Sequence, residues 1–461
     1  MQLTAHEIAA HSGGEVVHGD GNAVATSFAF DTRALEAGAC FVALLGHRDG
    51  HDFVEDAFAR GASVALVART PANWRDRSEA TLVRVDDPLA ALGRIAQVVR
   101  SERADLEVIG VTGSSGKTST KDMLRAALAT TGAVHANRDS FNNEFGLPLT
   151  LLEIDETTRY VITEMGARFA GNIRELCAVA QPTIGVITNI GLAHAEHLGG
   201  PAGVARVKAE LFEALPVDGL AVLNADDPWA EQVAARANCE VRTVGTTIDA
   251  DVRITDIVLR DDLRATCMVG GVEIQVPLRG EHQVHNAALA VTVARHLGVQ
   301  PDDIATGLAA AQGSRWRMEL ERTATDVVVL NDAYNANPAS MEAALRALAH
   351  LPTEGRRIAV LGEMLELGDH AAAAHAAVGK LLADLRIDLL VGVGEGGAAI
   401  ADAAPSVTSV IVADAAGARS ELEGCAQPGD AVLVKASRAV GLEAVAEGLR
   451  AVGPQARSAN Q

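Results

Sequence analysis

Residues 113–118 read Gly113-Ser114-Ser115-Gly116-Lys117-Thr118. An apolar run typical of a buried strand precedes them at 106–111, and apolar residues at helical spacing follow at 120–130. A glycine-rich turn between a strand and a helix directs backbone N–H groups and a helix N-terminus at phosphate oxygens. Lys117 can then reach the β- and γ-phosphates, and the Thr118 hydroxyl can ligate Mg²⁺. The turn therefore predicts a nucleoside triphosphate site.

The turn departs from the usual phosphate-loop pattern at one position, because Val111 stands where the first glycine is common. A glycine-rich turn that carries a lysine by chance is the alternative. A phosphate loop also leaves the type of protein open, since kinases, GTPases, motors and ligases all use one. The rest of the chain has to distinguish them.

Strand-like and helical segments alternate on both sides of this turn, which is typical of parallel sheets covered by helices. One segment differs: 252–277 alternates between apolar and polar residues around two turns, which predicts a small antiparallel patch. The strand-like runs lie at 40–45, 64–67, 81–85, 106–111, 160–163, 183–188, 219–223, 327–330, 358–361, 389–393, 409–412 and 431–434.

The chain has 461 residues, enough for about three domains. We predict an α/β protein with a small α/β N-terminal domain at 1–103 and a central phosphate-loop domain at 104–312 whose sheet is mostly parallel. A Rossmann-like α/β C-terminal domain is expected at 313–461. The first boundary follows from the charged stretch 100–105, and the second from a new α/β alternation that starts near 312.

Charge and composition exclude several classes of protein. With 39 basic and 60 acidic residues the net charge is −21, which argues against a general nucleic-acid binder. No apolar run approaches the roughly 18 residues of a membrane span, and the N-terminus lacks the pattern of a signal peptide. The five cysteines are scattered and form no zinc or disulfide pattern. We expect a cytoplasmic monomer with no nucleic-acid partner and no membrane span.

Six further motifs follow the phosphate loop in order. They are Phe141-Asn142-Asn143-Glu144-Phe145-Gly146-Leu147-Pro148, Glu164-Met165-Gly166-Ala167, Ile187-Thr188-Asn189-Ile190-Gly191-Leu192-Ala193-His194, Asn331-Asp332-Ala333-Tyr334-Asn335-Ala336-Asn337-Pro338, Leu361-Gly362-Glu363-Met364-Leu365-Glu366-Leu367-Gly368 and Lys435-Ala436-Ser437-Arg438. Together with the loop they resemble the Mur ligase family of ATP-dependent amide-bond ligases. The resemblance extends from Asp31 to Arg438.

The resemblance implies a reaction. ATP would phosphorylate a carboxylate to an acyl phosphate, and an amine would then attack it to form an amide. The last three motifs imply that the carboxylate belongs to UDP-N-acetylmuramoyl-tripeptide and the amine to D-alanyl-D-alanine. Which diamino acid stands third in the tripeptide does not follow from the motifs.

The resemblance also implies the metal ligands. Thr118 and Glu164 would bind one Mg²⁺, and a carboxylate after a strand suits that ion. His194 and Lys208 would bind a second Mg²⁺, Lys208 after CO₂ converts its amine to an anionic carbamate. Judged by residue type alone, His194 is a loop histidine that His197 could replace, and Lys208 is an ordinary helix lysine.

The remaining ATP contacts implied by the family come from the central and C-terminal domains. Arg317 would reach the phosphates, with Arg315 as a competitor, and Asp332 would bind the ribose. In Gly280-Glu281-His282-Gln283-Val284-His285-Asn286, Gln283 replaces the asparagine usual in the family. The full set implied for ATP is Gly113, Ser114, Ser115, Gly116, Lys117, Thr118, Ser119, Asn286, Arg317, Asp332, Tyr334 and Asn335.

Three groups of residues are implied for the other substrates. Asn142 and Asn143 would lie where the activated carboxylate meets the triphosphate, although an asparagine pair also suits a simple turn. The UDP end would meet the N-terminal domain, where arginine suits a pyrophosphate and a surface turn is the alternative. Those residues are Ser27, Asp31, Thr32, Arg33, Arg48, Asp49 and His51. Lys435 and Ser437 could bind the dipeptide carboxylate or orient the acyl phosphate.

Three alternatives remain beside this interpretation. The first is another muramoyl-peptide or folylpolyglutamate-type ligase, against which the motifs at 331–338 and 361–368 argue. The second is a regulatory ATPase that keeps the phosphate loop without ligation and would need neither Lys208 nor a UDP site. The third is an inactive scaffold, against which the intact Lys117, Glu164 and His194 speak.

Overall fold

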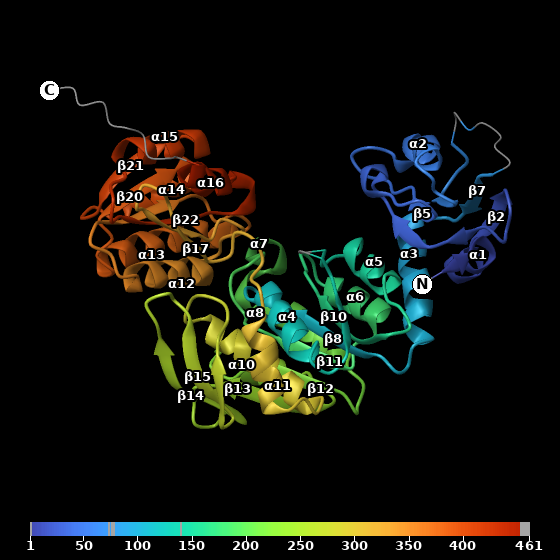
Figure 1. The fold of residues 1–461 in the computed structure, drawn as a ribbon, viewed down its shortest axis with the longest axis horizontal. Helices are drawn as coiled ribbons and strands as arrows, with labels where there is room; N and C mark the ends of the chain where they lie inside the picture. The colour runs from blue at the N-terminus through green and yellow to red at the C-terminus, as the bar shows by residue number, and fades with distance from the viewer. Residues whose placement is uncertain (1, 72–73, 75–78, 139–140, 452–461) are drawn as a thin grey trace.

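A computed structural model describes residues 2–71, 74, 79–138 and 141–451 and contains three α/β parts, each with its own larger sheet (Figure 1). The N-terminal part lies on one side of the central part and the C-terminal part on the other. No helix among these residues is both long enough and apolar enough to cross a membrane. The predicted α/β class with three domains is confirmed.

The N-terminal part is built on a five-stranded sheet in the order β2-β7-β6-β5-β4. Strands β4, β5, β6 and β7 pair in parallel, and β2 pairs with β7 in the antiparallel direction. Strands β1 and β3 form a separate two-stranded sheet. The strands are Leu3–Thr4, Glu15–His18, Val24–Ala25, Ser27–Ala29, Ala39–Val42, Val64–Val67 and Thr81–Arg84, in the order β1 to β7. The helices are α1 (Ala5–Ser12), α2 (Val54–Ala59) and the 3-10 turns Thr32–Ala34 and Gly50–Phe53.

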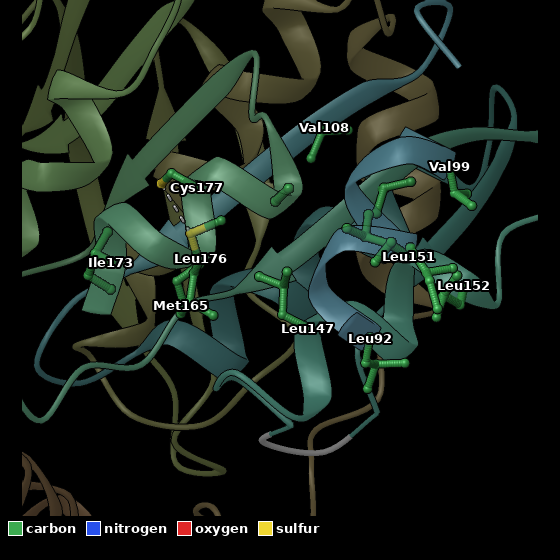
Figure 2. Close-up of a cluster of buried hydrophobic side chains, with 14 of the residues drawn as sticks. Leu92, Val99, Val108, Leu147, Leu151, Leu152, Met165, Ile173, Leu176 and Cys177 are labelled. Atoms are coloured by element: carbon green, nitrogen blue, oxygen red, sulfur yellow. Dashed lines mark hydrogen bonds between the residues drawn. The ribbon is translucent and has the colours of Figure 1, made fainter. Parts of the chain in front are cut away.

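The long helix α3 (Pro88–Ser101) joins the N-terminal part to the central part. Asp87 caps its start by accepting a hydrogen bond from the N–H of Leu89 at 2.8 Å, and Pro88 suits its first turn. Its apolar side packs on α5 (Gly146–Leu152) and α6 (Asn172–Ala180) of the central part. Figure 2 shows this cluster, in which Leu92 and Val99 lie with leucines of α5 and α6. The buried cluster therefore ties α3 to the central part.

The central part has a nine-stranded sheet in the order β16-β15-β14-β13-β12-β11-β8-β10-β9. Its strands pair in parallel from β9 to β14, and β14, β15 and β16 are antiparallel, so the predicted antiparallel patch is confirmed. The strands are Glu107–Thr112, Ala133–Ala136, Thr158–Glu164, Ile184–Ile187, Leu220–Asn224, Glu240–Gly245, Val252–Leu259, Ala265–Val269 and Val272–Gln275, in the order β8 to β16.

Helices cover both faces of this sheet. One face packs on α4 (Lys117–Leu128), α10 (Gln283–His296) and α11 (Pro301–Ala309), and the other on α3, α5, α6 and α8 (Gly200–Glu213). Val108 and Ile109 of β8 belong to opposite clusters, as expected when side chains alternate along a buried strand. Two short helices complete this part, α7 (Ala195–Leu198) and α9 (Ala230–Ala234).

The C-terminal part has a six-stranded sheet in the order β17-β18-β22-β19-β20-β21, parallel except for the edge strand β17. Helices α12, α13 and α14 cover one face, and α15 and α16 cover the other. The strands are Glu319–Arg322, Val328–Asn331, Arg357–Leu361, Leu389–Val393, Thr408–Val412 and Ala431–Lys435, in the order β17 to β22. The helices are Pro338–His350, Ala371–Asp384, Gly394–Asp402, Ala415–Cys425 and Glu443–Ala451, in the order α12 to α16. Short 3-10 turns lie at Gly368–His370 and Arg438–Val440.

Candidate active site

The phosphate loop connects the end of β8 to the start of α4, as predicted. Gly113 has φ 149° and Gly116 has φ 78°, both in the region that favours glycine. A Cβ at Gly113 would lie 1.9 Å from Thr188 Oγ1, and one at Gly116 would lie 2.5 Å from Asn286 Oδ1. Both glycines are therefore required by backbone conformation and by close neighbours.

The segment after β11 holds the loop in shape. The N–H of Ser115 donates to Asn189 Oδ1 at 2.9 Å, and the Thr188 hydroxyl donates to the Ser115 carbonyl at 2.6 Å. The N–H of Gly191 donates to Ser114 Oγ at 2.7 Å. Sequence reasoning quoted Thr188 and Asn189 within a motif but gave them no role. Their role depends on contacts more than seventy residues apart in the chain.

Lys117 is held beneath the loop, where its Nζ donates to the Gly113 carbonyl at 2.7 Å. Burial lowers the pKa of Lys117, and Arg317 acts in the same direction, while Glu164 opposes them. The ammonium group therefore lies against the backbone of the loop, where an anionic phosphate would offset the cost of burying it.

Glu164 at the end of β10 is buried and accepts two side-chain hydrogen bonds. Thr118 Oγ1 donates to its Oε2 at 2.8 Å, and Asn142 Nδ2 donates to its Oε1 at 2.8 Å. Its own N–H donates to Asn137 Oδ1 at 2.8 Å, which fixes the strand end. The hydroxyl and the carboxylate implied as Mg²⁺ ligands are thus direct neighbours beside the phosphate loop.

Arg317 crosses from the C-terminal part to the loop. Its Nη2 donates to Thr118 Oγ1 at 3.0 Å, and its guanidinium lies 4.0 Å from the ring centre of Tyr334. Its Nε is buried and has no hydrogen-bond partner among the described residues, so an anion would satisfy it. The competitor Arg315 instead pairs with Glu447 at 3.5 Å, and the Arg315 side chain is 77% exposed. The geometry favours Arg317 as the arginine that meets the phosphates.

His194 and Lys208 line the same cavity as the phosphate loop. Lys208 on α8 is 1% exposed, and burial lowers its pKa to about 7, aided by the charge of Lys117 and opposed by Glu164 and Glu210. Burial also lowers the pKa of His194, although the Glu366 carboxylate, bonded to its Nδ1, opposes that shift. A lysine with a pKa near neutrality has the amine chemistry that carbamate formation needs.

Asp332 and Lys435 form an ion pair in the C-terminal part. Lys435 Nζ lies 2.5 Å from Asp332 Oδ2 and also donates to the Asn335 carbonyl at 2.8 Å. The N–H of Met318 donates to Asp332 Oδ1 at 3.1 Å. Lys435 is therefore already paired, and a substrate carboxylate would have to compete with Asp332 for it.

Residues at the start of α10 line the same cavity as the phosphate loop. Asn286 Nδ2 donates to Gln283 Oε1 at 2.9 Å, and Gln283 Nε2 lies 3.4 Å from Ser119 Oγ. Gln283 thus maintains a bonded network at the position where the family usually has asparagine. Burial lowers the pKa of His282 to about 4, with Asp332 opposing the shift. His282 lines the cavity, yet the sequence offered only its place in the motif as a signal.

These groups surround one cavity of about 1310 Å³ between the central and C-terminal parts. The cavity extends past Asn142 and Asn143 to Leu89, Arg94 and Gln97 on α3. The predicted residues that line it are Ser114, Ser115, Gly116, Lys117, Thr118, Ser119, Asn142, Asn143, Glu164, His194, Lys208, Asn286, Arg317, Asp332, Tyr334, Asn335 and Lys435.

Ser437 lies outside this lining and braces a neighbouring loop. Its Oγ accepts a hydrogen bond from the Leu365 N–H at 2.9 Å and lies 3.5 Å from the Ala336 carbonyl oxygen. Its N–H donates to the Glu363 carbonyl at 2.9 Å. The side chain is buried, so its contacts are those of a structural tie rather than of a group open to substrate.

The predicted UDP residues of the N-terminal part also lie outside the cavity lining. Asp31 pairs with Arg33 at 2.6 Å, and the Arg33 side chain is 85% exposed. Hydrogen bonds from Arg33 lower the pKa of Asp31 to about 2. Thr32 follows Asp31 in a 3-10 turn, and Ser27 begins β4. Asp31 and Arg33 therefore lie in a turn at the surface of the N-terminal part, whereas Thr32 is buried.

The companion loop is held by Asp49. Its carboxylate bonds to Nδ1 of His51 at 2.7 Å and to Arg69 Nη2 at 2.6 Å. Hydrogen bonds from the N–H and the ring of His51 lower the pKa of Asp49 to about 2. The Arg48 guanidinium lies 4.4 Å from the centre of the Phe53 ring. The loop therefore presents a fixed turn with one arginine stacked on an aromatic ring.

The residues at the phosphate loop fit a hard cation bound together with phosphate oxygens. Within the described ranges no three His, Cys, Asp or Glu side chains gather as a metal cluster. The Thr118 hydroxyl and the Glu164 carboxylate nevertheless adjoin. Oxygen donors beside a phosphate loop are the usual ligands of Mg²⁺. The ion binds few protein ligands and keeps phosphate oxygens or water in its remaining coordination positions.

A phosphate loop beneath a third α/β domain, with an arginine reaching across, defines a nucleotide-dependent enzyme whose reaction occurs between domains. Residues 26–100 match the Mur ligase family catalytic domain, 111–294 the Mur ligase middle domain and 316–438 the Mur ligase glutamate ligase domain. The chain belongs to the Mur ligase family and is an ATP-dependent ligase, so the predicted resemblance is confirmed.

The relatives extend over nearly the whole chain. A Mycobacterium tuberculosis protein named UDP-N-acetylmuramoyl-tripeptide--D-alanyl-D-alanine ligase is 41% identical over 91% of each chain. MurF from Acinetobacter baumannii superposes with a TM-score of 0.88 at 31% identity, covering 98% of this chain and 99% of the other. MurF from Thermotoga maritima in complex with ADP has a TM-score of 0.79 at 27% identity, covering 92% and 97%.

Proposed function

We propose that this ligase joins D-alanyl-D-alanine to UDP-N-acetylmuramoyl-tripeptide, forming UDP-N-acetylmuramoyl-pentapeptide while ATP becomes ADP and phosphate. The observation that carries the proposal is the single cavity shared by the phosphate loop, Asn142, Asn143 and the C-terminal residues Arg317 and Asp332. Relatives named for this reaction cover nearly the whole chain.

The first step phosphorylates the tripeptide carboxylate. Its oxygen attacks the γ-phosphorus of ATP, and ADP leaves, so an acyl phosphate forms. Arg317 bonds to Thr118 and Lys117 to the Gly113 carbonyl, so both cations lie at the phosphate loop, where they would neutralise charge on the transferring group. Asn142, held by Glu164, can direct its amide toward the reacting carboxylate. The protein thus contributes positioning and charge rather than covalent chemistry.

The second step forms the amide. The neutral amine of D-alanyl-D-alanine attacks the acyl carbon, phosphate leaves, and the amine loses a proton. Water competes for the same intermediate, so the closed C-terminal part helps by covering it. We propose that Lys435, held by Asp332 and Asn335, orients the anionic groups at this end, and that Ser437 acts indirectly by bracing the loop at 363–365.

We propose two Mg²⁺ sites. Thr118 and Glu164 would hold the first, and His194 with carboxylated Lys208 the second. Mg²⁺ supplies charge neutralisation and orientation of the phosphate oxygens when it is bound. The buried Lys208 amine, with its pKa of about 7, is neutral often enough near neutral pH to attack CO₂ and release a proton. The positive charge of Lys117 nearby would stabilise the resulting anion.

The UDP end of the substrate is proposed to reach the N-terminal part. The cavity continues along Leu89, Arg94 and Gln97 of α3, which leads from the phosphate loop toward that part. Arg33 and Arg48 offer guanidinium groups suited to a pyrophosphate. Because UDP-linked precursors and ATP are cytoplasmic metabolites and one chain lines the whole cavity, we also propose a cytoplasmic monomer.

The test is product identification by mass spectrometry. The purified chain is incubated with ATP, Mg²⁺, UDP-N-acetylmuramoyl-tripeptide and D-alanyl-D-alanine, and the UDP-pentapeptide is expected. Parallel reactions replace the amine with a single amino acid, or the nucleotide substrate with the UDP-dipeptide or a folate. Product only in one of those reactions would assign another ligase activity. ATP hydrolysis without any adduct would indicate a non-ligating ATPase.

A further inference from the structure

One carboxylate of the C-terminal domain reaches the side of the cavity where the second metal is proposed. Glu366, in the loop after β19, bonds to Nδ1 of His194, which lies in the central domain after β11. The two residues are 172 positions apart in the sequence. They belong to different domains, so this pair exists only in a closed arrangement of the two.

Further contacts hold the central and C-terminal domains together around this pair. The N–H of Glu196 in α7 donates to the Glu366 carbonyl at 3.3 Å, and Leu192 packs against the core of the C-terminal domain. A Cβ at Gly368 would lie 3.2 Å from the Cα of Glu196, so the two backbones approach closely there. Figure 1 shows α7 at the edge of the central domain that faces the C-terminal domain. Arg168 adds a longer contact, 3.8 Å from Glu366.

Both members of the pair have an unusual backbone. His194 has φ 58° and Glu366 has φ 62°, in the left-handed region that non-glycine residues seldom adopt. Such conformations cost free energy and persist where the surrounding structure imposes them, often at functional sites. Two hydrogen bonds hold the loop just before Glu366. The Leu365 N–H donates to Ser437 Oγ at 2.9 Å, and the Met364 N–H donates to His375 Nε2 at 3.1 Å.

The chemistry of the pair assigns the ring nitrogens. An ionised carboxylate can only accept a hydrogen bond, so the proton of His194 is on Nδ1. Nε2 then keeps its lone pair for a metal in the neutral ring. Metal-binding histidines usually donate their other N–H to a carboxylate, which fixes the ring and makes it a better ligand. His194 lines the cavity within electrostatic range of Lys208, the other member of the proposed site.

We propose that Glu366 is a positioning residue for His194, and that the second metal site is complete only when the C-terminal domain closes. The inference rests on the proposed metal role of His194. Closure supplies the carboxylate that orients the imidazole, so closure and cation affinity are coupled. By reciprocity, a cation bound at His194 stabilises the closed form by the same factor.

The test uses Mn²⁺ as a spectroscopic probe in the full chain with a non-hydrolysable ATP analogue. Pulsed electron paramagnetic resonance detects the ¹⁴N coupling of a Mn²⁺-bound imidazole, titration gives the Mn²⁺ affinity, and small-angle X-ray scattering reports closure in the same samples. Wild type should show the coupling. Glu366→Ala should lose most of it and bind this Mn²⁺ about tenfold more weakly. Glu366→Gln, which keeps an acceptor oxygen, should recover the coupling.

Arg168→Ala is the matched control, because it removes the other side-chain contact of Glu366 across the same interface and leaves the histidine pair intact. It should retain the ¹⁴N coupling and the Mn²⁺ affinity at an equal closed fraction. If Glu366→Ala also retains both while closure falls, Glu366 is a docking contact only and the inference is overturned. If wild type lacks the coupling, the metal role of His194 fails as well, whereas product formation would still test the ligase activity separately.

Discussion

The nucleotide end and the UDP end of the proposed substrate path differ in construction. At the nucleotide end Glu164 and Lys208 are buried, Lys117 is half-buried and bonded to the loop, and Arg317 reaches Thr118 from another domain. At the UDP end Arg33 is 85% exposed and pairs with its near neighbour Asp31. The first end is preorganised for chemistry that must exclude water, and the second offers exposed groups for binding.

This difference predicts where mutations change kcat and where they change KM. Groups at the nucleotide end act on charge that develops in the transition state, so their loss should lower kcat. Groups at the UDP end hold a distant part of the substrate, so their loss should mostly raise its KM.

Lys117→Ala should cause the greatest loss of activity. It removes the ammonium that bonds to the Gly113 carbonyl of the phosphate loop, and kcat should fall on the order of 10³-fold. The measurement is steady-state product formation with saturating substrates. A circular dichroism melt controls for folding, and a variant that folds and keeps more than a tenth of wild-type kcat would contradict this role for Lys117.

Lys208→Met should lower kcat on the order of 10²-fold, because no carbamate can form. In wild type made carbamate-free, reactivation by bicarbonate should be faster above about pH 7, where the Lys208 amine is neutral. Activity assays after incubation at several pH values measure this. Reactivation that is independent of pH and of bicarbonate would contradict a carbamate.

In the carbamate-free chain the same substitution also has a predicted effect on stability. The pKa of Lys208 in the folded chain is about 7, below its ordinary value of 10.5, so the unfolded chain binds more protons between these values. Stability therefore rises with pH across this window, and the cost of the buried charge is fully present below about pH 7. Lys208→Met should raise the Tm most at low pH, with the gain shrinking as pH rises. A gain that grows with pH would refute the burial argument.

Arg33→Ala should raise the KM for the UDP substrate about tenfold or more and change kcat and the KM for ATP little. Arg33 is exposed, so the free energy of unfolding should stay within about 0.5 kcal/mol of wild type. Initial-rate kinetics with each substrate varied measure the three constants. Arg315→Ala, another exposed arginine, is the control and should leave that KM unchanged. An Arg33 variant that lowers kcat instead would place Arg33 in the chemistry.

Ser437→Ala should have the smallest effect. It leaves the N–H of Leu365 without its partner in a part-buried hydrogen bond, which costs about 0.5 to 1.5 kcal/mol of stability. Because Ser437 lies outside the cavity lining, activity per folded molecule should fall only a few-fold. Denaturant unfolding and kinetics in the same buffer test this. A large rise in the KM for D-alanyl-D-alanine at unchanged stability would restore Ser437 as a substrate ligand.

The sequence predicted the features that depend on neighbouring residues. The phosphate loop was predicted because its glycines and the flanking strand and helix lie within twenty-five residues, and the sheets because buried parallel strands are continuous apolar runs. The two-residue strands β1 and β3 were not predicted, since only their pairing with each other makes them strands. The family resemblance supplied His194 and Lys208, which residue type alone left as ordinary side chains.

The contacts between distant segments were not predictable from the sequence. Thr188 and Asn189 hold the phosphate loop, and Glu366 reaches His194, only after the sheet and the domain interface have formed. Burial also cannot be read from a single side chain, so the lowered pKa of Lys208 follows from the fold alone. Ser437, implied as a substrate residue, is bonded instead to the backbone of an adjacent loop.

We expect the phosphate loop to act only with a carboxylate and an amine bound between the domains. The measurement is phosphate release from ATP and Mg²⁺ with UDP-N-acetylmuramoyl-tripeptide, in the presence and absence of D-alanyl-D-alanine. Fast release is expected only when both substrates are present, in equal amount to the UDP-pentapeptide formed. Equal release without either substrate would contradict this expectation and would leave the loop serving some other reaction.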